Sequence, residues 1–179
     1  MKVQIIYSSL SGRTKTLAEA IAKEIEKDYT CTLHNIKNGE PKIYGDVILL
    51  GYWVDRGGPI KPMQEFIEKI EGKEVGIFCT LGYYADSKYA TQSVETAVNI
   101  LKGRNKILGT YVCNGALSDK MINMFKEQGN VPKQNEIRWE IMKNHPTKAE
   151  CALAAERFYE RIKILEKFKQ NNLEFKSIL

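Results

Sequence analysis

The segment from residue 5 to residue 21 constrains this chain more than any other part of it. An apolar run ends at Tyr7, small hydroxyl residues and Gly12 follow, and apolar residues then recur at helical spacing. This order predicts a strand, a tight polar loop and the N-terminus of a helix. Such a loop offers unpaired backbone N–H groups and the positive end of a helix dipole to an anion, and Gly12 lets the backbone approach it closely. The segment therefore predicts that a phosphate group binds near residue 10.

The same segment resembles the phosphate-binding signature of the flavodoxin-like family. That signature sets two aliphatic residues and an aromatic one before a hydroxyl residue, and then a small residue, a threonine, an alanine and an aliphatic residue. The constrained positions are all matched, by Ile5, Ile6, Tyr7, Ser9, Gly12, Thr14, Ala18 and Ile21. The resemblance implies FMN as the cofactor. Its phosphate would be held by the loop Ser9, Leu10, Ser11, Gly12, Arg13 and Thr14.

Other phosphate-binding loops fit this segment less well. A P-loop needs a lysine followed by serine or threonine after its last glycine, whereas Arg13 follows Gly12 here. A dinucleotide-binding fingerprint needs three spaced glycines, and the segment has one. The remaining alternative is a serine-rich turn that holds no ligand.

The rest of the chain alternates between strand and helix patterns. Apolar runs predict strands at residues 2–7, 30–35, 46–51, 74–79 and 107–113. Helical patterns occur at residues 13–27, from Pro59 or Pro62 onward, and at residues 87–101. This alternation predicts an α/β fold, a doubly wound five-stranded parallel sheet with helices on both faces, as in flavodoxin-like proteins. Ligands in such sheets bind at the carboxyl edge of the strands.

The resemblance also implies that two further loops face the flavin ring. The first follows the third predicted strand and contributes Tyr52, Trp53, Val54 and Asp55. Trp53 is expected to stack on the ring or to cover its edge, which would exclude water. Arg56 would favour a negatively charged reduced flavin if it lay near the ring, and Asp55 would oppose it. The alternative for Arg56 is a side chain that faces solvent.

The second loop follows the fourth predicted strand and contributes Thr80, Leu81, Gly82, Tyr83 and Asp86. The resemblance implies that Thr80, Leu81 and Gly82 offer backbone donors and acceptors to the pyrimidine edge of the ring. Tyr83, in preference to its neighbour Tyr84, is expected to cover the second face of the ring. Asp86 has an alternative role, because an aspartate that precedes a helix is often its N-cap.

Residues 114–146 form an insertion after the fifth predicted strand, within a single domain that spans residues 1–179. Their pattern predicts helices near residues 118–128 and 136–143. The insertion would start from the carboxyl edge of the sheet, where it can form a lid or a substrate wall. Trp139 is more typical of packing within a surface helix.

Motifs around the insertion suggest a finer relationship. The Cys113-Asn114-Gly115 turn and the His145-Pro146 helix entry resemble a subgroup of flavodoxin-like proteins from anaerobes, including some associated with bilirubin reductases. Thr147 and Glu150 then predict a capping box at the start of the last helix. That helix is expected to end near residue 171, with a loosely held tail beyond it.

The net charge of +5 favours acidic partners or anionic small molecules through electrostatic steering. It also differs from typical electron-transfer flavodoxins, which are strongly acidic. Lysines and arginines are scattered and alternate with glutamates along the predicted helices, so nucleic-acid binding is not expected.

The cysteine pattern and the absence of long apolar runs favour a cytoplasmic protein. The four cysteines form no CxxC pair, so neither a zinc site nor dithiol chemistry is predicted. The chain begins directly with a strand pattern, and we expect neither a signal peptide nor a membrane span.

No set of nucleophile, base and orienting residue is recognisable, so any redox chemistry would come from the flavin. The leading hypothesis is a flavoprotein that carries electrons between a reductase and a redox-partner protein. The alternative is an oxidoreductase that acts directly on a small substrate, such as a quinone, a tetrapyrrole or a flavin. A signalling domain without flavin is disfavoured, because Ser8-Ser9 and Gly51-Tyr52 stand where such domains need acidic residues. The pattern predicts no particular oligomeric state.

Overall fold

A computed structural model describes residues 1–179 and shows the predicted five-stranded parallel sheet, in the order β2-β1-β3-β4-β5. The strands are β1 (Lys2–Tyr7), β2 (Thr30–Asn35), β3 (Val47–Trp53), β4 (Glu74–Leu81) and β5 (Lys106–Asn114). The helices are α1 (Arg13–Ile25), α2 (Lys61–Ile67), α3 (Lys88–Leu101), α4 (Asp119–Glu127), α5 (Lys133–Met142) and α6 (Lys148–Gln170), with one 3-10 turn, η1 (Ile36–Asn38). Helix α2 begins beside Pro62 and not at Pro59, which leaves Pro59 in the preceding loop.

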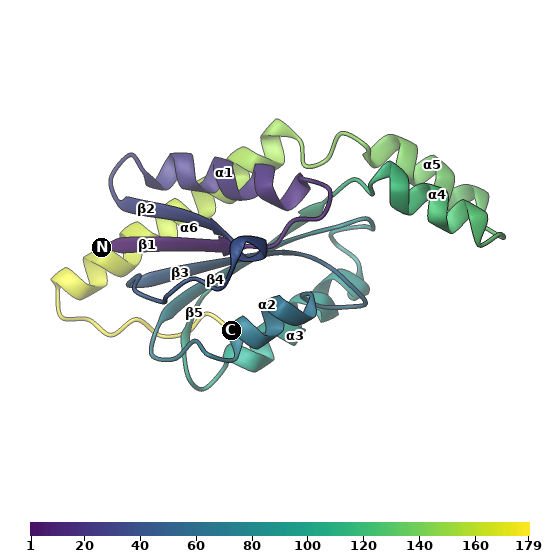
Figure 1. The fold of residues 1–179 in the computed structure, drawn as a ribbon. Coiled ribbons are helices and arrows are strands. Elements are labelled where there is room, and N and C mark those ends of the chain that lie inside the picture. Colours follow the sequence, from purple (N-terminus) through teal and green to yellow (C-terminus); the bar gives the residue numbers. More distant parts are fainter.

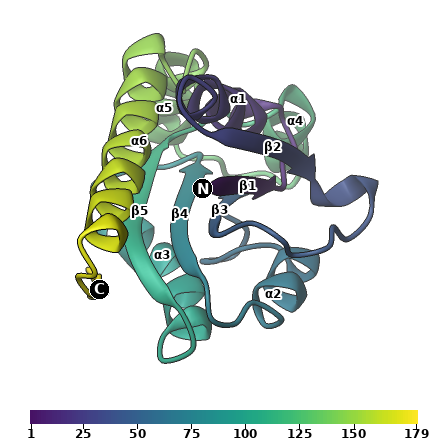
Figure 2. The ribbon, with the colours of Figure 1, turned by 90° about the vertical axis from the view of Figure 1, so that its left-hand side faces the viewer.

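Helices cover both faces of the sheet, as Figures 1 and 2 show: α1 and α6 lie on one face, and α2 and α3 lie on the other. Each pair encloses its own hydrophobic cluster. The central strand β3 contributes to both clusters, because its side chains alternate between the faces. Burial on both faces accounts for the continuous apolar run in its sequence. No helix of the structure has the length and apolar character that a membrane crossing requires.

The connection between β2 and β3 contains η1 and an extended segment in place of a long helix. The Gln4 side chain, which is 1% exposed, holds this segment against β1. Its Nε2 donates to the carbonyl of Lys42 at 2.8 Å. Its Oε1 accepts from the backbone N–H groups of Tyr44 at 3.2 Å and Gly45 at 3.3 Å. One buried amide thus forms hydrogen bonds with three backbone groups, which in a helix would pair with other backbone groups.

The C-terminal tail lies along the open edge of β5, which differs from the expectation of a loosely held segment. The N–H of Ile178 donates to the carbonyl of Ile107, and the N–H of Ile107 donates to Ser177 Oγ, both at 3.0 Å. Phe175 packs beside Phe168, with ring centres 6.2 Å apart. The reason for this docking is that an edge strand exposes unpaired backbone groups, and the tail satisfies some of them.

The two helices of the insertion form an α4–α5 hairpin (residues 118–143), which extends beyond the body of the molecule at the carboxyl edge of the sheet (Figure 1). Phe125 of α4 stacks on Trp139 of α5, with ring centres 5.7 Å apart and planes inclined by 24°. This contact confirms the packing role predicted for Trp139. Glu136 of α5 forms an ion pair with Lys126 of α4 at 3.9 Å, which joins the two helices. It forms a second ion pair with Lys133 at 3.0 Å, within α5.

We predict that Gln4→Leu lowers the free energy of unfolding by about 2–4 kcal/mol, because one buried and two partly buried backbone groups lose their partners. Urea unfolding followed by circular dichroism measures the change. Gln92→Leu, at an exposed site on α3, should change stability by less than about 0.5 kcal/mol. Equal unfolding energies for the two variants would contradict the role assigned to Gln4.

Candidate functional site

The loop between β1 and α1, here called the anion loop (residues 8–14), presents a series of unpaired donors. None of the backbone N–H groups of residues 9–14 donates to an acceptor in the protein. Gly12 adopts a left-handed conformation with φ of 86°, next to the first residue of α1. Alternation of left-handed and right-handed residues turns successive N–H groups toward one point and creates an anion-binding concavity. The loop therefore has two features that anion-binding loops share, unpaired backbone donors and a left-handed glycine at a helix start.

One side chain of this loop is also buried without a partner. Ser8 is fully buried, and its hydroxyl makes no hydrogen bond. The neighbouring Ser9 is in use, since its Oγ accepts from the backbone N–H of Lys15 at 3.3 Å. A buried hydroxyl without a partner is costly in a folded protein, so the Ser8 hydroxyl is a second sign that a polar ligand belongs here.

A buried pair of threonines joins the anion loop to β4. The hydroxyl oxygens of Thr14 and Thr80 lie 2.9 Å apart, and both side chains are almost completely buried. The backbone N–H of Val54 donates to the carbonyl of Thr80 at 2.9 Å. Thr80 therefore connects the loops that follow β1, β3 and β4, and these are the loops in which the sequence placed the candidate site.

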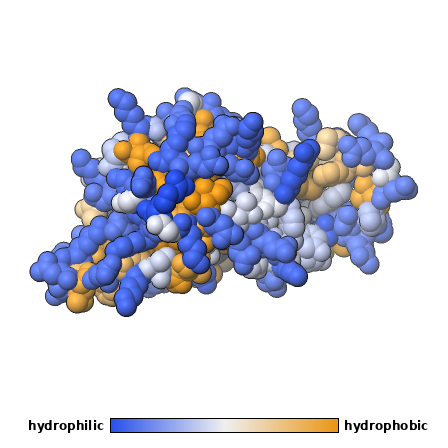
Figure 3. All heavy atoms as spheres, turned by 90° about the horizontal axis from the view of Figure 1, so that it is seen from below, coloured by the Kyte–Doolittle hydropathy of each residue, from blue (hydrophilic) through white to orange (hydrophobic).

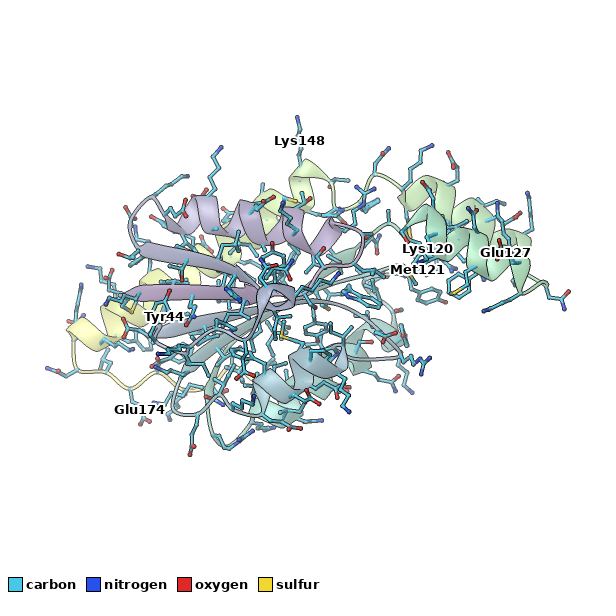
Figure 4. The ribbon with its side chains drawn as sticks, in the orientation of Figure 1. Tyr44, Lys120, Met121, Glu127, Lys148 and Glu174 are labelled. Atoms are coloured by element: carbon cyan, nitrogen blue, oxygen red, sulfur yellow. The ribbon has the colours of Figure 1, made fainter.

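These loops surround a cleft at the carboxyl edge of the sheet. Its lining includes predicted residues from each of them: Leu10, Ser11, Trp53, Val54, Thr80, Leu81 and Gly82. The segment after β5 completes the lining with Gly115, Ala116, Leu117, Ser118 and Met121. In Figure 4, Met121 lies at the inner end of α4, whereas Glu127 lies at the outer end of the hairpin. Sequence reasoning named Gly115 in a turn motif and placed the insertion at this edge, but it singled out none of the other four residues, because no motif marks them.

The wall formed by the insertion approaches β4 very closely. A Cβ atom at Gly82 would lie 2.6 Å from Cδ2 of Leu117, which is closer than real contacts allow. Gly82 thus permits the first residues of the insertion to close one side of the cleft. The indole N–H of Trp53 is buried in the same region and has no acceptor.

Other predicted site residues lie outside the lining of the cleft. Tyr52 is fully buried on the opposite face of β3, where its hydroxyl donates to the carbonyl of Ser93 at 3.0 Å. The backbone of Asp55 pairs with that of Gly58 in a tight turn. Arg56 and Gly57 at the centre of this turn both have positive φ, as a type I′ turn requires. The Arg56 side chain is exposed, which matches the solvent-facing alternative.

The tyrosines of the β4–α3 loop form an exposed aromatic group. The ring centres of Tyr83 and Tyr84 are 5.0 Å apart, and the guanidinium carbon of Arg138 lies 4.6 Å from the Tyr83 ring centre. Asp86 is exposed, and Ser87 is the N-cap of α3, accepting from the N–H of Ala90 at 3.2 Å. The alternative of Asp86 as the N-cap is therefore wrong. The serine one residue later has the extended backbone that a cap needs.

Comparison with known proteins identifies the family. A model described as a flavodoxin domain matches residues 4–159. This chain belongs to the flavodoxin-domain family. It is 32% identical over 147 residues to the flavodoxin-like domain-containing protein BilS of Clostridioides difficile (strain CD3), a match that covers 81% of this chain and 84% of BilS. The predicted resemblance to the flavodoxin-like family is confirmed.

Solved flavodoxins share the fold at low sequence identity. Oxidised flavodoxin 2 from Bacillus cereus matches with a TM-score of 0.59 and 18% identity, over 90% of this chain and 99% of that one. Fusobacterium nucleatum flavodoxin bound to flavin mononucleotide matches with a TM-score of 0.56 and 17% identity, over 93% of this chain and 97% of that one. Each match covers at least 90% of both chains, so the likeness extends over most of this flavodoxin domain.

The thiols of this flavodoxin domain are poor nucleophiles at neutral pH. All four cysteines are free. Burial raises the pKa of the Cys79 thiol to about 12 and that of the Cys31 thiol to about 12. Burial also raises the pKa of Cys113 and Cys151. Since the thiolate is the reactive form, the structure favours a packing role for these residues.

We predict that the buried Cys79 contributes to a loss of stability at alkaline pH. Its folded-state pKa is raised from 9.0 to about 12, so its contribution is complete below pH 9 and is lost as the pH rises toward 12. In Cys79→Ala, the free energy of unfolding should fall less steeply above about pH 9.5, by up to about 1.4 kcal/mol per pH unit. Urea unfolding at several pH values measures this slope.

The matched control is Ile77→Val, which removes a methyl group from the same face of β4 without removing a titrating group. It should lower stability at every pH and keep the wild-type slope. An unchanged slope in Cys79→Ala would show that Cys79 does not ionise on alkaline unfolding.

Proposed function

We propose that this chain binds FMN at the cleft and carries electrons between a reductase and a redox-partner protein. The observation that carries the proposal is the anion loop, whose N–H groups at residues 9–14 are unpaired and lie in the segment that resembles the family's phosphate-binding signature. The buried, unpartnered hydroxyl of Ser8 supports the same assignment. A related fold is known with flavin mononucleotide bound, in the flavodoxin of Fusobacterium nucleatum.

The residues that line the cleft fit the parts of FMN by their chemistry. The anion loop from Ser9 to Thr14 would hold the phosphate, through backbone N–H groups and hydroxyls. Trp53 offers an aromatic surface for the ring, and Thr80, Leu81 and Gly82 offer backbone donors and acceptors at its edge. When bound, FMN supplies reversible one- and two-electron transfer. The side chains would fix its position and limit the access of water.

Tyr83 and Asp86 lie on the exposed loop beside this cleft, and we propose that they belong to the surface that a partner meets. Leu10 at the anion loop is 48% exposed and adds an apolar residue to that surface. The net charge of +5 supports a partner with an acidic face, since complementary charge speeds encounter. The four free thiols fit a reducing compartment such as the cytoplasm.

The insertion supports a second candidate function, an oxidoreductase that acts on a small substrate such as a quinone, a tetrapyrrole or a flavin. Leu117 and Met121 give the cleft an apolar wall that comes from outside the three ligand-binding loops. An electron carrier needs no such wall, whereas an enzyme uses one to hold an apolar substrate against the ring.

The first experiment is a titration of the purified protein with FMN, followed by quenching of flavin fluorescence. We predict that Thr14→Val weakens FMN binding by about tenfold, because a hydroxyl donor to a charged phosphate is lost. Riboflavin has no phosphate, so its affinity should fall less than that of FMN, and any fall reports the lost contact between Thr14 and Thr80. Thr91→Val, at an exposed site on α3, should leave both affinities unchanged. Equal FMN affinity for Thr14→Val and the wild type would refute the phosphate assignment.

We predict that the FMN-loaded protein alone oxidises NADH and NADPH no faster than free FMN does, because a carrier receives electrons from a separate reductase. Absorbance at 340 nm measures the rate, about the wavelength at which any reduced nicotinamide absorbs. Rapid oxidation that depends on an added quinone, and that falls in Met121→Ser, would favour the second candidate function.

A further inference from the structure

Two side chains of the anion loop donate hydrogen bonds to the two ends of the α4–α5 hairpin. The Ser11 hydroxyl donates to the carbonyl of Ala116 at 3.2 Å, just before α4 begins. Nη2 of Arg13 donates to the carbonyl of Lys143 at 2.9 Å, where α5 ends. The N–H of Ala116 in turn donates to the carbonyl of His145 at 3.3 Å, which joins the two connecting segments of the hairpin. The loop thus holds the hairpin at both of its ends.

The rest of the hairpin extends away from the body of the protein (Figures 1 and 4). Arg138 of α5 provides a further contact, with its guanidinium carbon 4.6 Å from the Tyr83 ring centre and 5.6 Å from that of Tyr84. Ile137 and Ile141 are 52% and 70% exposed. Apolar surface is visible at the hairpin in Figure 3. A hairpin with so little buried surface depends strongly on a few polar contacts at its base.

A phosphate group in the anion loop would compete for these contacts. Ser11 and Arg13 belong to the segment whose backbone N–H groups have no acceptor in the protein. A phosphate dianion is a stronger acceptor than a backbone carbonyl, particularly for a guanidinium group. Nε of Arg13 is buried and has no acceptor, so the side chain has an unused donor beside the one that Lys143 takes.

We propose that Ser11 and Arg13 are positioning residues that couple occupancy of the anion loop to the α4–α5 hairpin. Their hydrogen bonds to Ala116 and Lys143 hold the hairpin. A phosphate monoester in the loop would draw both donors to itself and so release the hairpin. Release loosens the contact of Arg138 with Tyr83 and Tyr84 and changes the surface that the carboxyl edge presents. A partner can then distinguish the loaded protein from the empty one. This inference rests on the proposed binding of FMN.

Hydrogen–deuterium exchange of the full chain tests the coupling, with mass spectrometry of peptides from residues 118–143. Samples are the empty protein and the protein saturated with FMN, with riboflavin, or with inorganic phosphate. We expect exchange in the hairpin to become about five- to tenfold faster with FMN and with phosphate, as expected when about one net hydrogen bond is lost. Riboflavin, which has the ring but no phosphate, should leave the rate unchanged.

Variants separate this coupling from a general effect of ligand. The double variant S11A/R13Q should show fast hairpin exchange without ligand, and inorganic phosphate should not increase it further. Lys15→Gln is the matched control, because it removes one positive charge from the same turn of α1 while its side chain pairs with Glu19 and not with the hairpin. It should behave as the wild type does. Slow exchange in unliganded S11A/R13Q would overturn the proposal.

The outcomes also distinguish failure of the coupling from failure of the proposed function. If FMN binds and hairpin exchange stays unchanged or slows, the coupling is wrong and the proposed function stands. If FMN does not bind but phosphate accelerates hairpin exchange in the wild type alone, the coupling stands and the FMN assignment fails. If neither ligand binds, both are wrong.

Discussion

Burial of the parallel sheet on both faces is the constraint on which the rest of this structure depends. Helices α1 and α6 cover one face, and α2 and α3 cover the other. The backbone groups of the inner strands pair within the sheet, and their side chains pack into the two hydrophobic clusters. Unpaired polar backbone of the sheet is then available at the strand ends and along the outer edges of β2 and β5. The anion loop, Thr80 and the turn at Asp55 to Gly58 all occur at such ends. The candidate site lies at one set of these ends, the carboxyl edge of the sheet.

The sequence predicted the parts of the site that depend on local rules. The anion loop could be recognised because its strand, its hydroxyl residues and Gly12 are consecutive, and the conformation of such a loop is set largely by those residues. Contacts between distant segments were harder to predict. Tyr52 was grouped with the cleft by its place in the chain, but strand alternation directs its side chain into the opposite core. Leu117 and Met121 carry no recognisable motif, and their role follows only from the path of the chain after β5.

Two further features have a common cause in unpaired backbone groups, and one of them, the docked tail, departs from expectation. The segment between β2 and β3 is not a long helix, and Gln4 supplies the hydrogen bonds that a helix would make internally. The tail follows β5 because the open edge offers donors and acceptors to any extended chain. Neither Gln4 nor the tail has a strong sequence signal, since each acts through a partner far away in the chain. Satisfaction of the backbone is a property of the assembled fold and not of a short pattern.

The docked tail also bears on how the chain is made. Strand β5 is complete at Asn114, but the residues that cover its outer edge, Ser177 and Ile178, are synthesised after all of α6. If the sheet assembles before these residues are made, its edge at β5 is open and another extended chain could pair with it. The tail thus covers an edge of β5 that no strand of the sheet pairs with. Docking of the tail therefore ends the period in which a second extended chain could add to β5.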